Sequence, residues 1–183
     1  MKKTILITGT SSGIGKSTVI EFAKNGWNVI ATQRNPEKET DFKTFNNVKL
    51  YPLDVTNLDS ITQVFNKVKE EFGTIDVVLN NAGYGVDGAF EAMSDEVIEK
   101  QFNTNVFGLM RVTREAIKVM RPSGGGTIIQ ISSMGGKITF PLYSILLLLS
   151  VAAIKIVLAT TSGPSASFIT FSAAALNFEI KTS

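Results

Sequence analysis

Residues 8–15 read Thr8-Gly9-Thr10-Ser11-Ser12-Gly13-Ile14-Gly15, and this stretch decides the fold because of what flanks it. It follows the β-branched apolar run 4–7 and opens a helical pattern whose apolar positions fall within 19–23. A strand, a glycine-rich turn and a helix in this order aim backbone N–H groups and the positive end of the helix at a phosphate. The glycines allow a positive φ, a close approach to a pyrophosphate and tight packing of helix on strand. The stretch therefore predicts a nucleotide site at Gly9, Ser11, Ser12, Gly13, Ile14 and Gly15.

Gly15-Lys16-Ser17 also resembles the end of a P-loop. That loop requires G-x-x-x-x-G-K-[ST], and its first glycine would fall at Thr10. It also needs a metal-binding aspartate after a buried strand, whereas the run before Asp54 contains Lys49 and Pro52. We therefore favour a dinucleotide site over a P-loop.

Strand and helix patterns alternate through the first three quarters of the chain. The predicted strands cover 4–7, 28–32, 75–79 and 128–133, and the predicted helices cover 13–24, 57–72 and, with interruptions, 94–122. This alternation predicts an α/β fold with a doubly wound parallel sheet. Ligands of such sheets bind beyond the carboxyl ends of the strands, where the strand order reverses. The glycine turn, residues 80–83 and residues 132–133 all follow such strand ends.

Several further motifs appear in order. They are Asp54-Val55, Asn80-Asn81-Ala82-Gly83 after the strand at 75–79, Asn103 to Gly108 within the long helical pattern, and Ile128 to Ser133 in the last predicted strand. Together with T-G-x-x-x-G-x-G, they resemble the short-chain dehydrogenase/reductase family over about residues 3–143. The resemblance implies a Rossmann-type dinucleotide-binding domain over residues 1–143. It also implies reversible hydride transfer between a nicotinamide and a small-molecule carbonyl or alcohol.

The resemblance also implies roles for single residues. Asp54 and Val55 match the adenine contacts, and Asn80, Ala82 and Gly83 match the segment that lines the cofactor and steadies the sheet. Asn105 matches an asparagine that supports an active-site lysine through water, and Ser133 matches a serine that donates a hydrogen bond to the substrate oxygen.

Each of these residues has a simpler interpretation. Asp54 can be a turn or cap residue before Thr56-Asn57, and residues 80–83 can be a strand-ending turn. Asn105 can be an exposed helix residue. Ser133 can close a strand, as can Ser132.

Arg34 bears on the choice of cofactor. An acidic residue after the second strand would hydrogen-bond a ribose 2′-hydroxyl, but this chain reads Ala31-Thr32-Gln33-Arg34. A cation suits a 2′-phosphate, with Ser11 or Ser12 as additional donors. The pattern favours NADP(H) over NAD, and the simpler interpretation is a solvated surface arginine.

The chain departs from the family at its proton-transfer pair. The family carries Y-x-x-x-K, in which the lysine lowers the pKa of the tyrosine one helical turn away. Counting from Ser133, these residues should fall at 146 and 150, which are Leu146 and Ser150. Losing a general acid/base typically costs ~10²–10⁴-fold in rate. We therefore expect severely impaired turnover.

Composition changes at the same place. Residues 144–183 carry only three charges, on Lys155, Glu179 and Lys181. A frame-disrupted carboxyl terminus of an ordinary enzyme explains this best, which would leave the fold incomplete there, with the tail disordered or part of the same domain. The alternatives are a non-catalytic NADP-binding regulator and, least favoured, a membrane anchor at 145–159, which is shorter than the ~20 residues of a span. With such a tail a homo-oligomer is doubtful.

The overall composition excludes several classes. A net charge of +2 is too small to argue for nucleic acid as a partner. The chain has no cysteine and no histidine, which removes disulfides, thiolate chemistry and the commonest metal ligand. The sequence thus predicts no metal site and no membrane partner, and it is compatible with a reducing, cytoplasmic location.

Overall fold

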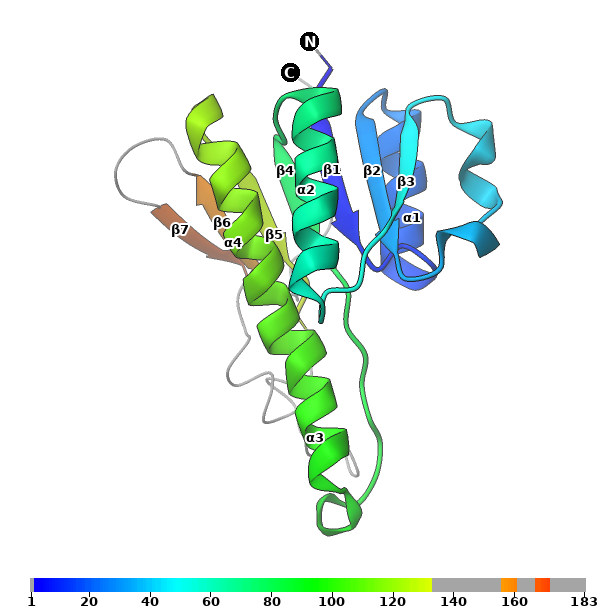
Figure 1. Ribbon diagram of the computed structural model, residues 1–183, viewed down its shortest axis with the longest axis vertical. Helices are drawn as coiled ribbons and strands as arrows, with labels where there is room; N and C mark the ends of the chain where they lie inside the picture. Colours follow the sequence, from blue (N-terminus) through cyan, green and yellow to red (C-terminus); the bar gives the residue numbers. More distant parts are fainter. Residues whose placement is uncertain (1, 133–155, 161–166, 172–183) are drawn as a thin grey trace.

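The computed structural model describes residues 2–132, 156–160 and 167–171 (Figure 1). The five strands of its main sheet are β1 (Thr4–Thr8), β2 (Asn28–Gln33), β3 (Val48–Pro52), β4 (Val77–Asn80) and β5 (Thr127–Gln130). The α-helices are α1 (Gly13–Lys24), α2 (Leu58–Phe72), α3 (Asp95–Phe102) and α4 (Leu109–Met120). Short helical turns are η1 (Pro36–Lys38), η2 (Asp41–Thr44), η3 (Phe90–Ala92), η4 (Asn103–Gly108) and η5 (Arg121–Ser123).

The five strands are parallel in the order β3-β2-β1-β4-β5. Ile5 pairs with Val29 on one side and with Val77 on the other, so β1 lies at the centre of the sheet. The chain first moves outward from β1 to β3 and then returns to place β4 on the other side of β1. The order therefore reverses between β1 and β4, which is where such sheets bind ligands. The predicted doubly wound α/β fold is confirmed.

Side chains that alternate along the strands build one apolar core on each face of the sheet. Ile5 and Ile7 pack with Val19 and Phe22 of α1, whereas Leu6 packs on the opposite face. The core of that opposite face also takes residues of α2 and α4: Ile61, Val64, Phe65, Val68, Val112, Ala116, Val119 and Met120. In Figure 1, α2 and α4 lie in front of the sheet and α1 lies behind it. Burial on both faces fixes the register, since a one-residue slip would exchange the two cores.

The helix ends follow the local signals in the sequence. Asn57 caps α2, because its side-chain oxygen accepts a hydrogen bond from the Ser60 N–H at 3.0 Å. Gly73 and Gly26, with φ of +76° and +80°, follow the ends of α2 and α1. The boundaries of both helices agree with the prediction.

Three regions differ in detail from the sequence prediction. Lys49 and Pro52 do lie in a strand, and β3 tolerates them because it is at the edge of the sheet. The long helix predicted over 94–122 consists of α3, the π-helical turn η4 and α4. The last strand of the main sheet ends at Gln130, earlier than predicted.

A second pair of strands lies outside the main sheet. β6 (Ile156–Thr160) and β7 (Ser167–Phe171) are antiparallel, and β6 lies beside β5 (Figure 1). Among the described residues, no helix has the length and apolar character to cross a membrane. The rest of the predicted tail, including most of the apolar run 145–159, lies outside the described residues.

Candidate functional site

A cavity of about 1070 Å³ opens at the carboxyl ends of the strands, above the point where the strand order reverses. It brings together twelve of the fourteen residues that the sequence predicts for the site: Gly9, Ser11, Ser12, Gly13, Ile14, Arg34, Asp54, Val55, Asn80, Ala82, Gly83 and Asn105. Gly15 is buried beneath the turn and does not line the cavity. Ser133 lies outside the described residues, whereas its neighbour Ser132 is on the cavity wall.

The glycine turn is packed so tightly that side chains cannot replace its first and last glycines. Gly9 has a φ of +71°, and a Cβ there would lie 2.8 Å from the Cα of Ala82. A Cβ on Gly15 would overlap with the carbonyl oxygen of Gly9. By contrast, a Cβ on Gly13 would meet nothing within 4 Å, because Gly13 faces the cavity. Gly9 and Gly15 are therefore required by packing, whereas Gly13 leaves room for a ligand.

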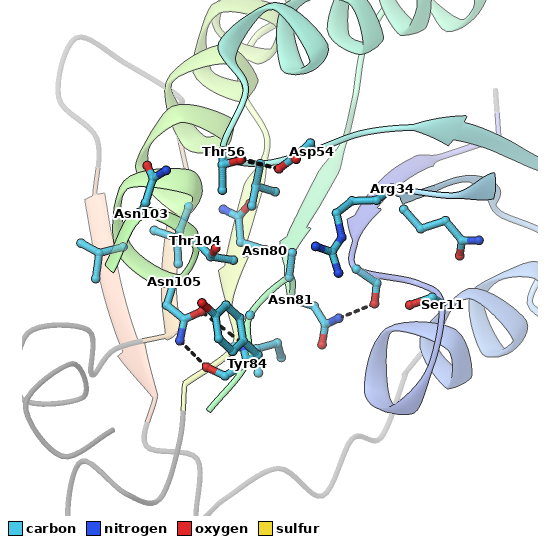
Figure 2. A pocket seen from close by; sticks show the side chains of 18 of the residues that line it. Ser11, Arg34, Asp54, Thr56, Asn80, Asn81, Tyr84, Asn103, Thr104 and Asn105 are labelled. Carbon is cyan, nitrogen blue, oxygen red and sulfur yellow. Dashed lines mark hydrogen bonds between the residues drawn. The ribbon is translucent and has the colours of Figure 1, made fainter. Parts of the chain in front are cut away.

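Asn81 fixes the turn to the neighbouring strand, a role that the sequence alone did not indicate. Its side-chain Nδ2 donates hydrogen bonds to the carbonyl oxygens of Thr8 at 3.0 Å and Gly9 at 2.9 Å, and the bond to Gly9 is drawn in Figure 2. In return, the Thr8 hydroxyl oxygen accepts from the backbone N–H groups of Asn81 and Ala82, both at 3.0 Å. These four bonds clamp the end of β4 to the end of β1. They account for the asparagine that follows Asn80 in the sequence.

Arg34 and Ser11 lie together on one side of the cavity, across from Asn105 and Tyr84 (Figure 2). Arg34 follows the end of β2, and its side chain and Ser11 are both exposed. A guanidinium and a hydroxyl placed together at a cavity wall can bind an anionic group such as a phosphate.

Asp54 is a turn residue that also lies on the cavity wall. Its Oδ1 accepts hydrogen bonds from the Thr56 N–H at 2.8 Å and the Thr56 hydroxyl at 2.7 Å, which makes it a turn residue (Figure 2). It also lines the cavity beside Val55. Val55 is 7% exposed, and Gly108 of η4 packs directly against it, since a Cβ on Gly108 would lie 2.8 Å from Val55 Cγ2.

Asn105 lies on the cavity wall and uses both ends of its amide. Its Oδ1 accepts from the Tyr84 N–H at 3.1 Å, and its Nδ2 donates to the Tyr84 carbonyl at 2.7 Å (Figure 2). Gln101, which is fully buried one turn earlier, donates from Nε2 to the same carbonyl at 3.2 Å. Asn105 is therefore no simple exposed helix residue: with Gln101 it holds the loop after β4 in place. The resemblance places a lysine beside it, but the matching position is Ser150, which lies outside the described residues.

Asn80 belongs to a buried polar cluster below the cavity. Its Nδ2 and the Nε2 of Gln130 both donate to the hydroxyl oxygen of Thr113, each at 3.0 Å. The cluster ties the ends of β4 and β5 to α4. Gln130 and Thr113 were missed in the sequence, since neither has a local signal and they meet only through the packing of α4 on the sheet.

The described residues hold no group of three or more histidine, cysteine, aspartate or glutamate side chains that could bind a metal ion. The site instead combines a glycine turn, backbone N–H groups, amides and hydroxyls with the charged residues Arg34, Lys100 and Asp54. These groups suit a nucleotide.

Comparison with known proteins agrees with this arrangement. A family model described as short chain dehydrogenase matches residues 3–145. An oxidoreductase of Schizosaccharomyces pombe is 43% identical over 144 residues, which are 77% of this chain and 48% of the relative. A 3-ketodihydrosphingosine reductase of Bacteroides thetaiotaomicron is 39% identical over 137 residues, which are 75% of this chain and 49% of the relative. The chain thus spans about half the length of the curated relatives it matches.

Solved structures give the same result. The structure of ElxO with NADP bound is similar with a TM-score of 0.78 and 35% identity, covering 84% of this chain and 64% of that one. A short-chain dehydrogenase from Streptomyces avermitilis has a TM-score of 0.78 and 34% identity, covering 83% and 57% of the two chains. Because the family model spans most of the sequence and the sheet has the same architecture, the chain belongs to the short-chain dehydrogenase family of oxidoreductases.

Proposed function

We propose that this chain binds NADP(H) in the cavity above β1 and β4, and that its reaction class is hydride transfer between a nicotinamide and a carbonyl or alcohol substrate. The observation that carries the proposal is the glycine turn, whose tight packing on Ala82 leaves its exposed face, at Ser11 to Ile14, on the cavity wall. The relative ElxO, with NADP bound, supports the choice of cofactor.

The residues present fit such a cofactor. The cavity volume of about 1070 Å³ lies at the upper end of the range for ligand pockets, ~300–1,000 Å³. The backbone N–H groups at the start of α1 would hold the diphosphate, because they have no partner within the helix and lie at its positive end. Asp54 would accept from the adenine amine through the carboxylate oxygen that Thr56 leaves free. Asn80, Ala82 and Gly83 would line the nicotinamide half of the cofactor, which supplies or accepts the hydride when bound.

Arg34 provides a direct test of the choice between NADPH and NADH. The variant Arg34→Gln should raise the Kd for NADPH about tenfold or more, since a charge-assisted bidentate contact with the 2′-phosphate is lost. The Kd for NADH should stay nearly the same, because NADH lacks that phosphate. Isothermal titration calorimetry with both cofactors measures the two constants. Arg121→Gln, at an exposed site in η5, is the control for the loss of one positive charge. If Arg34→Gln weakened the binding of NADPH and NADH equally, the proposed role of Arg34 would be wrong.

Ser133 is the residue that we propose to polarise the substrate oxygen, and Asn105 holds the cavity wall through its hydrogen bonds to Tyr84. Proton transfer is the step for which the chain lacks the usual groups, because Leu146 and Ser150 occupy the positions of the tyrosine and lysine. This observation favours a second candidate, a non-catalytic regulator that binds NADPH.

Binding and turnover should therefore separate. We expect NADPH to bind the full chain, and NADPH oxidation with a panel of aldehydes and ketones to be ~10²–10⁴-fold slower than that of relatives with the intact pair. Absorbance at the nicotinamide band follows the oxidation. Turnover at the full rate of those relatives would contradict the expected impairment, and binding without any turnover would favour the regulator.

A further inference from the structure

Lys16 is a charged residue next to the glycine turn, but it does not line the cavity. It lies in the first turn of α1, directly after Gly15. Its ammonium forms ion pairs with Asp41 Oδ2 at 2.6 Å and Glu39 Oε2 at 3.3 Å. A P-loop lysine would instead turn toward the phosphates, so the geometry agrees with the rejection of that motif.

The acidic partners of Lys16 belong to an ordered local structure. The Glu39 side chain is only 5% exposed, and its Oε1 accepts from the N–H groups of Thr40 at 2.9 Å and Asp41 at 2.8 Å. Phe42, which is buried against α1, lies under the ammonium with its ring centroid 5.9 Å from Nζ. The ammonium thus sits in a defined pocket of two carboxylates and an aromatic ring.

The hydrogen bond between Lys16 and Asp41 favours the charged form of both groups. The hydrogen bond from Lys16 lowers the pKa of Asp41, and that same bond is the main reason why the pKa of Lys16 is raised. Without the ammonium, two carboxylates would remain, one of them nearly buried. The negative charge of these carboxylates would then weaken the binding of an anion nearby.

The cluster joins the two segments that form the anion-binding end of the cavity, which holds Ser12 and Arg34. Lys16 follows Ser12 by one helical turn, and Glu39 and Asp41 follow Arg34 by five and seven residues. Ser12 and Arg34 both line the cavity. The ion pairs are therefore a bridge between the turn that faces the diphosphate and the loop that faces the ribose.

We propose that Lys16 is a positioning residue for cofactor selection: it holds the loop after Arg34 against α1 and offsets one of the two negative charges of Glu39 and Asp41, so that a ribose 2′-phosphate is accepted beside Arg34. This role rests on the proposed NADP(H) site. The ligand selected in this way is a nucleotide that bears a 2′-phosphate. Lys16 acts through the loop and through its charge, and it does not contact the cofactor itself.

The test compares Lys16→Met with Lys16→Arg and Lys24→Met. Lys24 is exposed at the other end of α1, so its variant makes the same charge change away from the cluster. The Kd for NADPH should rise about three- to tenfold in Lys16→Met, while the Kd for NADH changes less than twofold. Lys16→Arg should restore the ratio of the two constants, and Lys24→Met should leave it unchanged. Calorimetric titration gives both constants without requiring turnover.

A further variant separates charge from folding. Asp41 is 55% exposed, so Asp41→Asn should fold, and by removing one carboxylate it should leave NADPH binding as tight as in the wild type or tighter. Added to Lys16→Met, it should recover part of the lost preference for NADPH. Equal Kd changes for NADPH and NADH in Lys16→Met, or no change in either, would overturn the role of Lys16. A wild-type chain that binds neither cofactor would instead overturn the proposed function.

Discussion

Gly15→Ala is expected to destabilise the fold by about 2–4 kcal/mol and to abolish measurable NADPH binding. In an ordinary helix interior this substitution stabilises by up to ~1 kcal/mol, because alanine is the better helix former. Here the sign reverses, since the new methyl overlaps with the Gly9 carbonyl oxygen and crowds the amide of Asn81. Both atoms belong to the clamp that holds the turn, so relief of the overlap must move the turn itself. Urea unfolding and calorimetric titration measure the two effects.

The matched control for Gly15→Ala adds the same methyl beyond the other end of α1. Gly26 has a φ of +80°, and a Cβ there meets nothing within 4 Å. Gly26→Ala should therefore cost only about 1–2 kcal/mol of backbone strain and leave the Kd for NADPH unchanged. If Gly15→Ala were as stable as the wild type and bound NADPH equally well, the packing described for the turn would be wrong.

Asn81→Asp is expected to cost about 2–4 kcal/mol of stability, although the two side chains have nearly the same shape. The amide Nδ2 donates to the carbonyl oxygens of Thr8 and Gly9, and a carboxylate oxygen in its place would face both of them with no proton. Three acceptors would then meet where a donor is needed. Urea unfolding at pH 7 measures the loss, and NADPH binding should weaken with it because the same bonds hold the glycine turn.

The pH dependence of this variant has a definite sign. A carboxyl group facing two carbonyl oxygens keeps its proton more readily in the folded state, so its folded pKa lies above the unfolded value of ~4. The destabilisation is therefore complete above the folded pKa, and it shrinks as the pH falls from there to the unfolded pKa. The stability of the variant, measured relative to the wild type at each pH from 8 down to 4, tests this dependence. Asn81→Asp losing the same stability at every pH would show that charge is not the cause.

Local signals in the sequence predicted the parts of the fold that depend on near neighbours. The run 4–7, the glycine turn and the cap at Asn57 act within a few residues. The helix α1 has the predicted bounds, and those of β1 and α2 agree to within one residue. The alternation of strands and helices then predicted a doubly wound parallel sheet, although not the order of its strands. Most of the twelve residues around the cavity follow from that prediction, since they come after strands that end at one edge of the sheet.

Contacts between distant segments could not be predicted in this way. Gln101 and Thr113 are ordinary helix residues in the sequence, and their roles appear only once the helix lies across the loop after β4 and the end of β5. Lys16 lies in a stretch that resembles the end of a P-loop, but its ion-pair partners are more than twenty residues away in the sequence. The π-helical turn η4 has no clear signal either, although Gly108 within it is needed for contact with Val55.

The central claim is that the turn after β1 holds the diphosphate of a dinucleotide through its backbone N–H groups. Amide chemical shifts of the ¹⁵N-labelled full chain, recorded during titration with NADPH, test this most directly. The account predicts saturable shifts that are largest at Ser11, Ser12 and Gly13, with little change at the Trp27 indole on the far side of α1. Saturation of NADPH binding with these amides unmoved, or an absence of binding at millimolar NADPH, would contradict it.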